Sequence, residues 1–176
     1  AQVHWGDQMG LRRDHPTGTS YAPRGQTPVL RGTEQRFSCK VMSTLTNHGK
    51  LRFMMFQRRF TNDVFLEFLR RLLRSVDRKV FQIVDRHPVH KAKKVERCMA
   101  ERSDRIAVFF LPGYTPELNP HEQLNQDVKR NAVGRRRPAN PQQMIHRVRT
   151  YLKSNQRQPD PVQNYFQADP VTHAAH

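Results

Sequence analysis

The chain has 176 residues and carries 31 Lys and Arg against 15 Asp and Glu, which gives a formal net charge of +16. This length suffices for one domain with its own core, and this charge makes nucleic acid the expected partner without separating a DNA-binding protein from a DNA-cutting enzyme. Two cysteines without CxxC spacing argue against a disulfide scaffold and a zinc finger, and no apolar run approaches the roughly 20 residues of a membrane span, so we expect a cytoplasmic protein without a membrane partner.

Residues 1–11 have the alternating pattern of a β-strand, with Val3, Trp5 and Asp7 on one side. Asp7 then lies near the end of the strand, although a surface Asp in a glycine-flanked turn is an alternative interpretation. The following stretch, Arg12–Thr33, is rich in Gly, Pro and Arg and is typical of a long irregular loop. In a DNA enzyme such a loop can lie along the nucleic-acid backbone.

A hairpin and a helix are predicted next. Gln35–Thr46 and Leu51–Phe56 have strand character, and the residues between them, Asn47–Lys50, are typical of a turn. Thr61–Val76 is the clearest helix, because its apolar residues recur on one wide stripe while three arginines lie off that stripe. We expect this helix to pack on the core.

Strand, helix and strand alternate in the middle of the chain. Val80–Asp85 and Ile106–Leu111 are short apolar runs that suit central strands, and Lys91–Arg102 between them is compatible with a helix. This order predicts a parallel βαβ unit. Asp85 then lies at the carboxyl end of a parallel strand, where open α/β sheets place their functional sites.

A Pro-rich turn leads from the second of these strands into another helix. Asn119 suits the N-cap of that helix, and Pro120 suits its first position. Glu122 lies in the first turn, where the helix dipole favours a carboxylate, and it faces away from the apolar side formed by Leu124 and Val128. A carboxylate on a rigid element that points away from the core suits metal or acid–base chemistry, although simple solvation is the alternative.

The C-terminal part has one more predicted helix. Pro141–Asn155 carries an apolar stripe at helical spacing. After Gln158 the composition turns to Pro, Gln, Asp and His, so we expect one domain over residues 1–158 and a poorly ordered tail over residues 159–176.

Three motifs carry a resemblance to a known family. They are residues 111–130, LPGYTPELNPHEQLNQDVKR; residues 85–91, DRHPVHK; and, more weakly, residues 5–7, WGD. These motifs resemble those of DDE transposases of the mariner superfamily, in particular of its bacterial insertion-sequence branch. The resemblance covers Trp5–Arg130 and implies an α/β, RNase H-like fold with a mixed central sheet flanked by helices. The helix-turn-helix modules that precede this domain in the family are not found in the sequence, so we expect recognition of element ends to be absent or supplied elsewhere.

The resemblance implies a catalytic site of three acids. Asp7, Asp85 and Glu122 match the positions of the family's catalytic, metal-binding residues, and the last two are 122 − 85 = 37 positions apart. The family is metal-dependent, which implies two Mg²⁺ or Mn²⁺ ions. Its chemistry implies hydrolysis of phosphodiesters at element ends and joining of the 3′-hydroxyl to target DNA, with a homodimeric synaptic complex as a further option. We expect the basic side chains to contact DNA phosphates; these are Arg12, Arg13, His90, Lys91, Lys93, Lys94, Arg135, Arg136 and Arg137.

Four residues depart from the family pattern: Gln8, Arg86, His121 and Asn125. His121 and Asn125 stand where the family has apolar helix residues, so we expect them to loosen the packing of the helix on the sheet. The departures leave open an inactive nucleic-acid-binding remnant of a transposase. An RNase H-like nuclease is a separate alternative.

Overall fold

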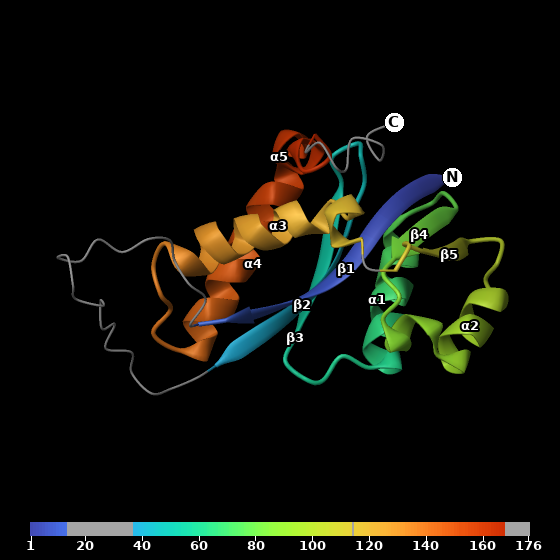
Figure 1. Cartoon of the computed structure of the whole chain (residues 1–176), viewed down its shortest axis with the longest axis horizontal. Helices are drawn as coiled ribbons and strands as arrows, with labels where there is room; N and C mark the ends of the chain where they lie inside the picture. Colours follow the sequence, from blue (N-terminus) through green and yellow to red (C-terminus); the bar gives the residue numbers. More distant parts are fainter. Residues whose placement is uncertain (14–36, 114, 168–176) are drawn as a thin grey trace.

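The structure is a computed structural model that describes residues 1–13, 37–113 and 115–167. A five-stranded sheet with the strand order β3-β2-β1-β4-β5 forms its centre (Figure 1). The strands are β1 Gln2–Arg12, β2 Ser38–Leu45, β3 Leu51–Phe56, β4 Val80–Val84 and β5 Ile106–Phe110. The first three strands pair antiparallel, and β4 and β5 run parallel to β1. This confirms the predicted RNase H-like fold, whereas most of the predicted loop Arg12–Thr33 lies outside the described residues.

Helices cover both faces of the sheet (Figure 1). One face packs against α1 Asn62–Ser75 and α2 Lys93–Ala100, and the other packs against α3 His121–Val128, α4 Pro141–Arg157 and α5 Pro159–Asn164. Three short helical turns complete the described elements: η1 Pro88–Lys91, η2 Pro116–Leu118 and the π-helical η3 Lys129–Gly134. In the interior strand β2, Val41 faces the α4 side and Met42 faces the α1 side, and both are fully buried.

The local signals identified in the sequence form the predicted elements. The hairpin turns at Gly49, whose φ of +81° lies in the left-handed region that favours glycine. Thr61 caps α1, because its hydroxyl accepts the backbone N–H of Val64 at 3.5 Å. None of the described helices combines the length and the apolar character that crossing a bilayer requires.

The C-terminal segment differs from the prediction of a poorly ordered tail. Residues 159–164 form α5, and Val162 and Phe166 are buried in the core against α4. Tyr165 donates its hydroxyl hydrogen to Asp127 and accepts a hydrogen bond from Asn155 Nδ2 at 3.1 Å. The ordered domain therefore extends past Gln158, while residues 168–176 lie outside the described part of the chain.

Candidate active site

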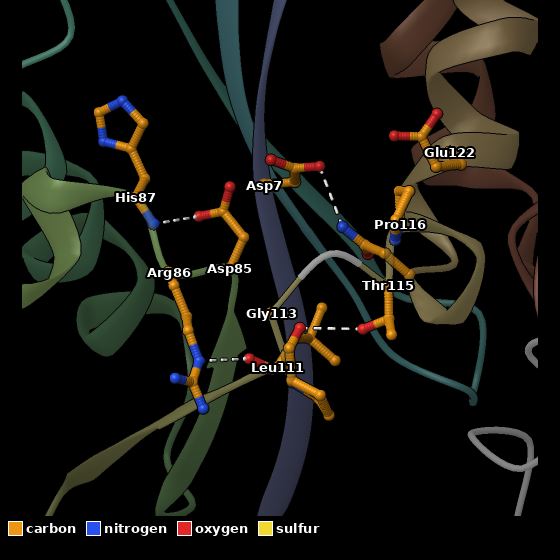
Figure 2. Close-up of a pocket in the computed structure, with 11 residues that line it drawn as sticks. Asp7, Asp85, Arg86, His87, Leu111, Gly113, Thr115, Pro116 and Glu122 are labelled. Atoms are coloured by element: carbon orange, nitrogen blue, oxygen red, sulfur yellow. Dashed lines mark hydrogen bonds between the residues drawn. The ribbon is translucent and has the colours of Figure 1, made fainter.

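The register of the parallel strands brings Asp7 beside Asp85. β1 and β4 pair from Gln2 with Val80 to Trp5 with Ile83, an offset of 80 − 2 = 78 positions. Extending this offset by two residues places position 7 opposite position 85, just past the last paired residues. Figure 2 shows both carboxylates at the same pocket.

Gly6 makes this part of the sheet possible. A Cβ atom at this position would lie 2.0 Å from Gln82 Nε2 on the neighbouring strand β4, far inside van der Waals contact. The Gln82 side chain is fully buried, and its Oε1 accepts a hydrogen bond from the Thr44 hydroxyl at 3.4 Å. A larger residue before Asp7 would therefore have to displace a buried polar side chain.

The third acid, Glu122, enters the site from α3. Leu124 and Val128 are fully buried on the core side of this helix, while Glu122 is half-buried and lines the pocket. This confirms the predicted orientation of the helix. Figure 2 shows Asp7 between Asp85 and Glu122, so that acids from β1, from the end of β4 and from α3 share one pocket of about 520 Å³.

Two side chains at the start of α3 fasten it to β1. Asn119 was predicted to be the N-cap, but α3 begins at His121 and Pro120 occupies the N-cap position. Asn119 Oδ1 still accepts the backbone N–H of His121 at 3.1 Å. The Asn119 amide also donates to Asp7 Oδ2 at 3.0 Å. His121 Nε2 donates to the Trp5 carbonyl at 2.6 Å. These bonds fix Glu122 relative to Asp7, and no sequence motif indicated them.

His121 corrects the expectation of loosened packing. Its ring is fully buried and bonded through both nitrogens, because Nδ1 also lies 3.4 Å from the Ser43 hydroxyl. Since a carbonyl can only accept, Nε2 carries the hydrogen and Nδ1 accepts from Ser43. Burial lowers the pKa of His121 to about 4, so the ring is neutral at pH 7. Asn125 is also buried, and its Oδ1 has no partner among the described residues.

The Asp7 carboxyl group has a strongly raised pKa. Burial raises the pKa of Asp7 to about 7, the backbone N–H of Gln8 opposes that shift, and the charges of Asp85 and Glu122 raise it further. The Gln8 N–H donates to Asp7 Oδ1 at 2.7 Å. This contact uses the main chain, so the Gln side chain at position 8 does not prevent it. A carboxylate that is costly to ionise beside two others attracts a proton or a cation.

Asp85 has the opposite electrostatic environment. His90 Nδ1 lies 2.9 Å from Asp85 Oδ1, and the backbone N–H of His87 donates to the same oxygen at 3.1 Å. These hydrogen bonds, that of His90 first, lower the pKa of Asp85. Near neutral pH the two aspartates therefore differ, with Asp85 ionised and Asp7 close to its midpoint.

The position of His90 does not suit the DNA contact predicted for it. Its ring is only 2% exposed and packs against Phe65 and Phe60, with centroid distances of 4.5 and 5.7 Å. The ring instead orients Asp85 from the interior. His90 Nε2 has no hydrogen-bond partner among the described residues. The HxxH spacing gave no indication of this burial, which depends on contacts with α1.

The remaining basic candidates are mostly exposed, and their DNA contacts stay predictions. Lys91 lies over the Phe110 ring, with Nζ 5.7 Å from the centroid. Lys93 is exposed, and Lys94 pairs with the exposed Asp63 at 2.6 Å. A single exposed ion pair of this kind is weak, so it would not prevent Lys94 from contacting a phosphate.

The other basic candidates lie at the end of β1 and directly after η3. Arg12, Arg135 and Arg136 are exposed, Arg137 is partly buried, and Arg13 Nε donates to the Pro138 carbonyl at 3.0 Å. The sequence predicted DNA contacts for these side chains. It did not indicate that Arg13 would contact the segment after η3, which lies more than 100 positions away.

Arg86 lines the pocket without approaching the acids. Its Nε donates to the Leu111 carbonyl at 3.1 Å, and Figure 2 shows its guanidinium directed away from Asp85. The departure from Asn at this position therefore leaves the space beside the carboxylates open.

The chemistry of the three acids fits hard divalent cations. Carboxylate oxygens are the ligands that Mg²⁺ and Mn²⁺ prefer. Within the described residues, however, no group of three or more His, Cys, Asp or Glu is close enough to hold one metal ion. Asp7 interacts electrostatically with both other acids and lies between them in Figure 2. The arrangement thus suits ions that share Asp7 better than one ion held by all three acids.

Comparisons with known proteins agree with this geometry. The family model described as "DDE superfamily endonuclease" matches residues 2–145. The fold is similar to a pre-cleavage Mos1 transpososome chain, with 14% identity, a TM-score of 0.69, and coverage of 99% of this chain and 56% of that chain. It is also similar to the catalytic domain of Mos1 mariner transposase, with 12% identity, a TM-score of 0.60, and coverage of 99% and 82%. Identities this low establish the fold alone. A search of curated proteins found no match.

Proposed function

We propose that this chain, which belongs to the DDE superfamily endonuclease family, is the metal-dependent catalytic domain of a DNA transposase. It hydrolyses phosphodiesters at element ends and joins the 3′-hydroxyl to target DNA. The observation that carries this proposal is the convergence of Asp7, Asp85 and Glu122 on one pocket from three separate elements. The motif at residues 111–130 further supports the bacterial insertion-sequence branch of the mariner superfamily.

Asp7, Asp85 and Glu122 would hold two Mg²⁺ or Mn²⁺ ions. When bound, such a pair supplies an activated water or hydroxyl and stabilises the leaving oxygen. His90 holds the Asp85 carboxylate in place, and Asn119 holds that of Asp7. Metal dependence is supported by the Mos1 paired end complexes, which were solved with Mn and with Mg.

DNA is the proposed partner, both as element ends and as target. The formal net charge of +16 supports this choice. The similar Mos1 chains come from assemblies described as a paired-end complex with the left transposon end and a strand transfer complex. A homodimer in a synaptic complex is part of the proposal. This chain spans 56% of the first Mos1 chain, so activities of the whole transposase are included only as proposals.

A nicking and strand-transfer assay tests the proposal. Plasmid and labelled duplex DNA are incubated with the protein and Mg²⁺ or Mn²⁺, alongside Asp85→Ala and the exposed-loop control Asp104→Asn. We expect metal-dependent cutting that Asp85→Ala abolishes and Asp104→Asn retains. DNA binding without cutting would favour the inactive remnant, and preferential cutting of an RNA–DNA hybrid would favour an RNase H-like nuclease.

A further inference from the structure

A second pocket lies between η3 and α4, and its lining is basic. It has a volume of about 480 Å³ and is lined by Arg135, Arg136, His146 and Arg147, together with the hydroxyls of Thr150 and Ser154. Among the described residues, no carboxylate lines this η3–α4 pocket or forms an ion pair with its three arginines. Asp127 accepts hydrogen bonds from two lining side chains, Asn131 Nδ2 and the Tyr151 hydroxyl, but is not itself part of the lining. The lining itself therefore offers hydrogen-bond donors and the positive charge of three arginines.

The backbone that forms the η3–α4 pocket is unusual. α3 continues directly into the π-helical η3, which ends at Gly134 beside α4 (Figure 1). Single π-helical turns of this kind are rare and occur frequently at functional sites. Along α4, positions 146, 147, 150 and 154 recur at the spacing of one helix face, so that face is directed at η3.

Contacts to the main chain orient two of the arginines near the pocket. Arg147 is partly buried, and its Nη1 donates to the Arg136 carbonyl at 2.5 Å. Arg13 reaches the same loop from the end of β1, where its Nε donates to the Pro138 carbonyl at 3.0 Å. A guanidinium has five N–H donors in a fixed fork, so the bond of Arg147 to a carbonyl restrains that side chain while its other N–H donors can contact a phosphate.

The η3–α4 pocket is separate from the active site. Glu122 lies in α3, and Arg135 lies 135 − 122 = 13 positions later, directly after η3. At the α-helical rise of about 1.5 Å per residue this is at most about 20 Å, because a π-helix rises less per residue; that length equals roughly six base pairs of B-DNA at about 3.4 Å each. A duplex that occupies the catalytic pocket is long enough to reach this second pocket.

We propose that the η3–α4 pocket binds the phosphodiester backbone of duplex DNA beyond the cleavage site. The inference rests on the proposed function only in its choice of DNA as the ligand. Guanidinium forks and hydroxyl donors fit phosphate oxygens, and their contacts carry no base specificity, so the pocket grips the duplex without reading its sequence.

The test measures DNA affinity with EDTA present, so that cutting is absent. The pocket variant Arg135→Ala/Arg147→Ala is compared with Arg74→Ala/Arg78→Ala, which removes the same charge from exposed positions at the α1 side of the sheet. The ligand is a duplex of about 30 base pairs, roughly 100 Å long at about 3.4 Å per base pair. The slope of log affinity against log salt is negative, and we expect its magnitude to decrease by about 1.8 in the pocket variant, at about 0.9 per lost phosphate contact, and to change little in the control.

Three outcomes overturn the inference. Equal salt slopes in the pocket variant and the control mean that the net charge of the protein attracts DNA without a localised binding site. Inorganic phosphate that binds the wild-type protein but not the pocket variant, while duplex affinity stays unchanged, indicates a small-anion site. If the double variant does not fold by circular dichroism, Arg135→Glu alone serves, because this side chain is exposed, and unchanged duplex affinity again contradicts the inference. A protein that never cuts DNA yet shows the expected slope change refutes the proposed function and leaves this inference standing.

Discussion

The two ends of the helical segment from His121 to Gly134 follow different physical rules. At the α3 end, buried partners hold two of the three acids: Asn119 bonds Asp7, and the core-packed His90 bonds Asp85. At the η3 end, Arg135 and Arg136 of the η3–α4 pocket are exposed, and Arg147 is restrained by a hydrogen bond to a main-chain carbonyl. Cleavage requires fixed geometry, whereas a grip on a polyanion requires mainly charge. Substitutions at the α3 end should therefore strongly reduce metal-dependent cutting. Substitutions at the η3 end should weakly reduce DNA affinity, by an amount that depends on salt.

The largest effect is expected at Glu122. Glu122→Gln keeps the shape of the side chain and removes its charge, so we predict loss of metal-dependent cutting by about 10²–10³-fold, the range typical when one electrostatic contact to a transition state is lost. DNA affinity in EDTA should not fall, because the arginines on the same helical segment are untouched. Glu117→Gln, an exposed acid in η2, is the matched control and should cut normally. Equal losses in both variants would end the distinction between the two ends.

His90 should come next. His90→Phe preserves packing against Phe60 and Phe65 but removes the hydrogen bond to Asp85. Loss of such a supporting partner typically costs about 10–100-fold in metal affinity or activity. Titration calorimetry with Mn²⁺ separates this effect from a general loss of structure, since the weaker binding should appear without a matching fall in melting temperature. The same change at exposed His48 should leave Mn²⁺ affinity unaltered.

The raised pKa of Asp7 predicts a pH-dependent stability. Its pKa is about 7 in the folded chain against 3.8 ordinarily, so the folded state holds the proton more tightly than the unfolded state. Stability should then fall as pH rises from about 4 to about 7, and the full cost remains at higher pH. At about 1.36 kcal/mol per pKa unit, about 4 kcal/mol is the upper bound of this cost.

Chemical denaturation from pH 4 to pH 8 measures that cost. Asp7→Asn should stabilise the protein at pH 8 and have little effect at pH 4. Mg²⁺ should raise the melting temperature of the wild type more at pH 8 than at pH 6, because a proton competes for the same carboxylate. A variant that is no more stable than the wild type at pH 8 would contradict the assigned environment of Asp7.

The smallest effect compares two asparagines at helix N-termini. Asn119→Ala removes the hydrogen bond to the His121 N–H at the start of α3. Asn140→Ala removes the N-cap of α4, whose Oδ1 accepts the Gln143 N–H at 2.8 Å. Each should cost about 1 kcal/mol in the free energy of unfolding. Only Asn119→Ala should also weaken Mn²⁺ binding, because only Asn119 contacts Asp7. Equal Mn²⁺ affinities in the two variants would show that the Asn119 contact does not support the site.

The elements were predictable from the sequence because their signals are local. The apolar stripe of α1, the hairpin around Gly49 and the βαβ order depend on residues within one element or its neighbours. The three acids were located by motif resemblance. The register that brings Asp7 to Asp85 was not predictable, since an offset of 78 positions is set only when the sheet assembles.

The remaining features depend on contacts between distant segments. The prediction that His90 contacts DNA did not anticipate its burial, because the spacing between His87 and His90 carries no information on packing against Phe65. α5 was predicted to be poorly ordered because its polar composition outweighed Val162 in any local average. His121 was expected to loosen the packing because its partners belong to β1 and β2. In each case the long-range partner determines the role of the side chain.

The most direct test of the central claim is a crystal of the protein soaked in Mn²⁺ and measured by anomalous diffraction. The account predicts anomalous density in the pocket of Asp7, Asp85 and Glu122, next to Asp7, and loss of that density in a crystal of Asp7→Asn. An ordered pocket without anomalous density at millimolar Mn²⁺ would contradict the assignment of these three acids as a metal-binding active site.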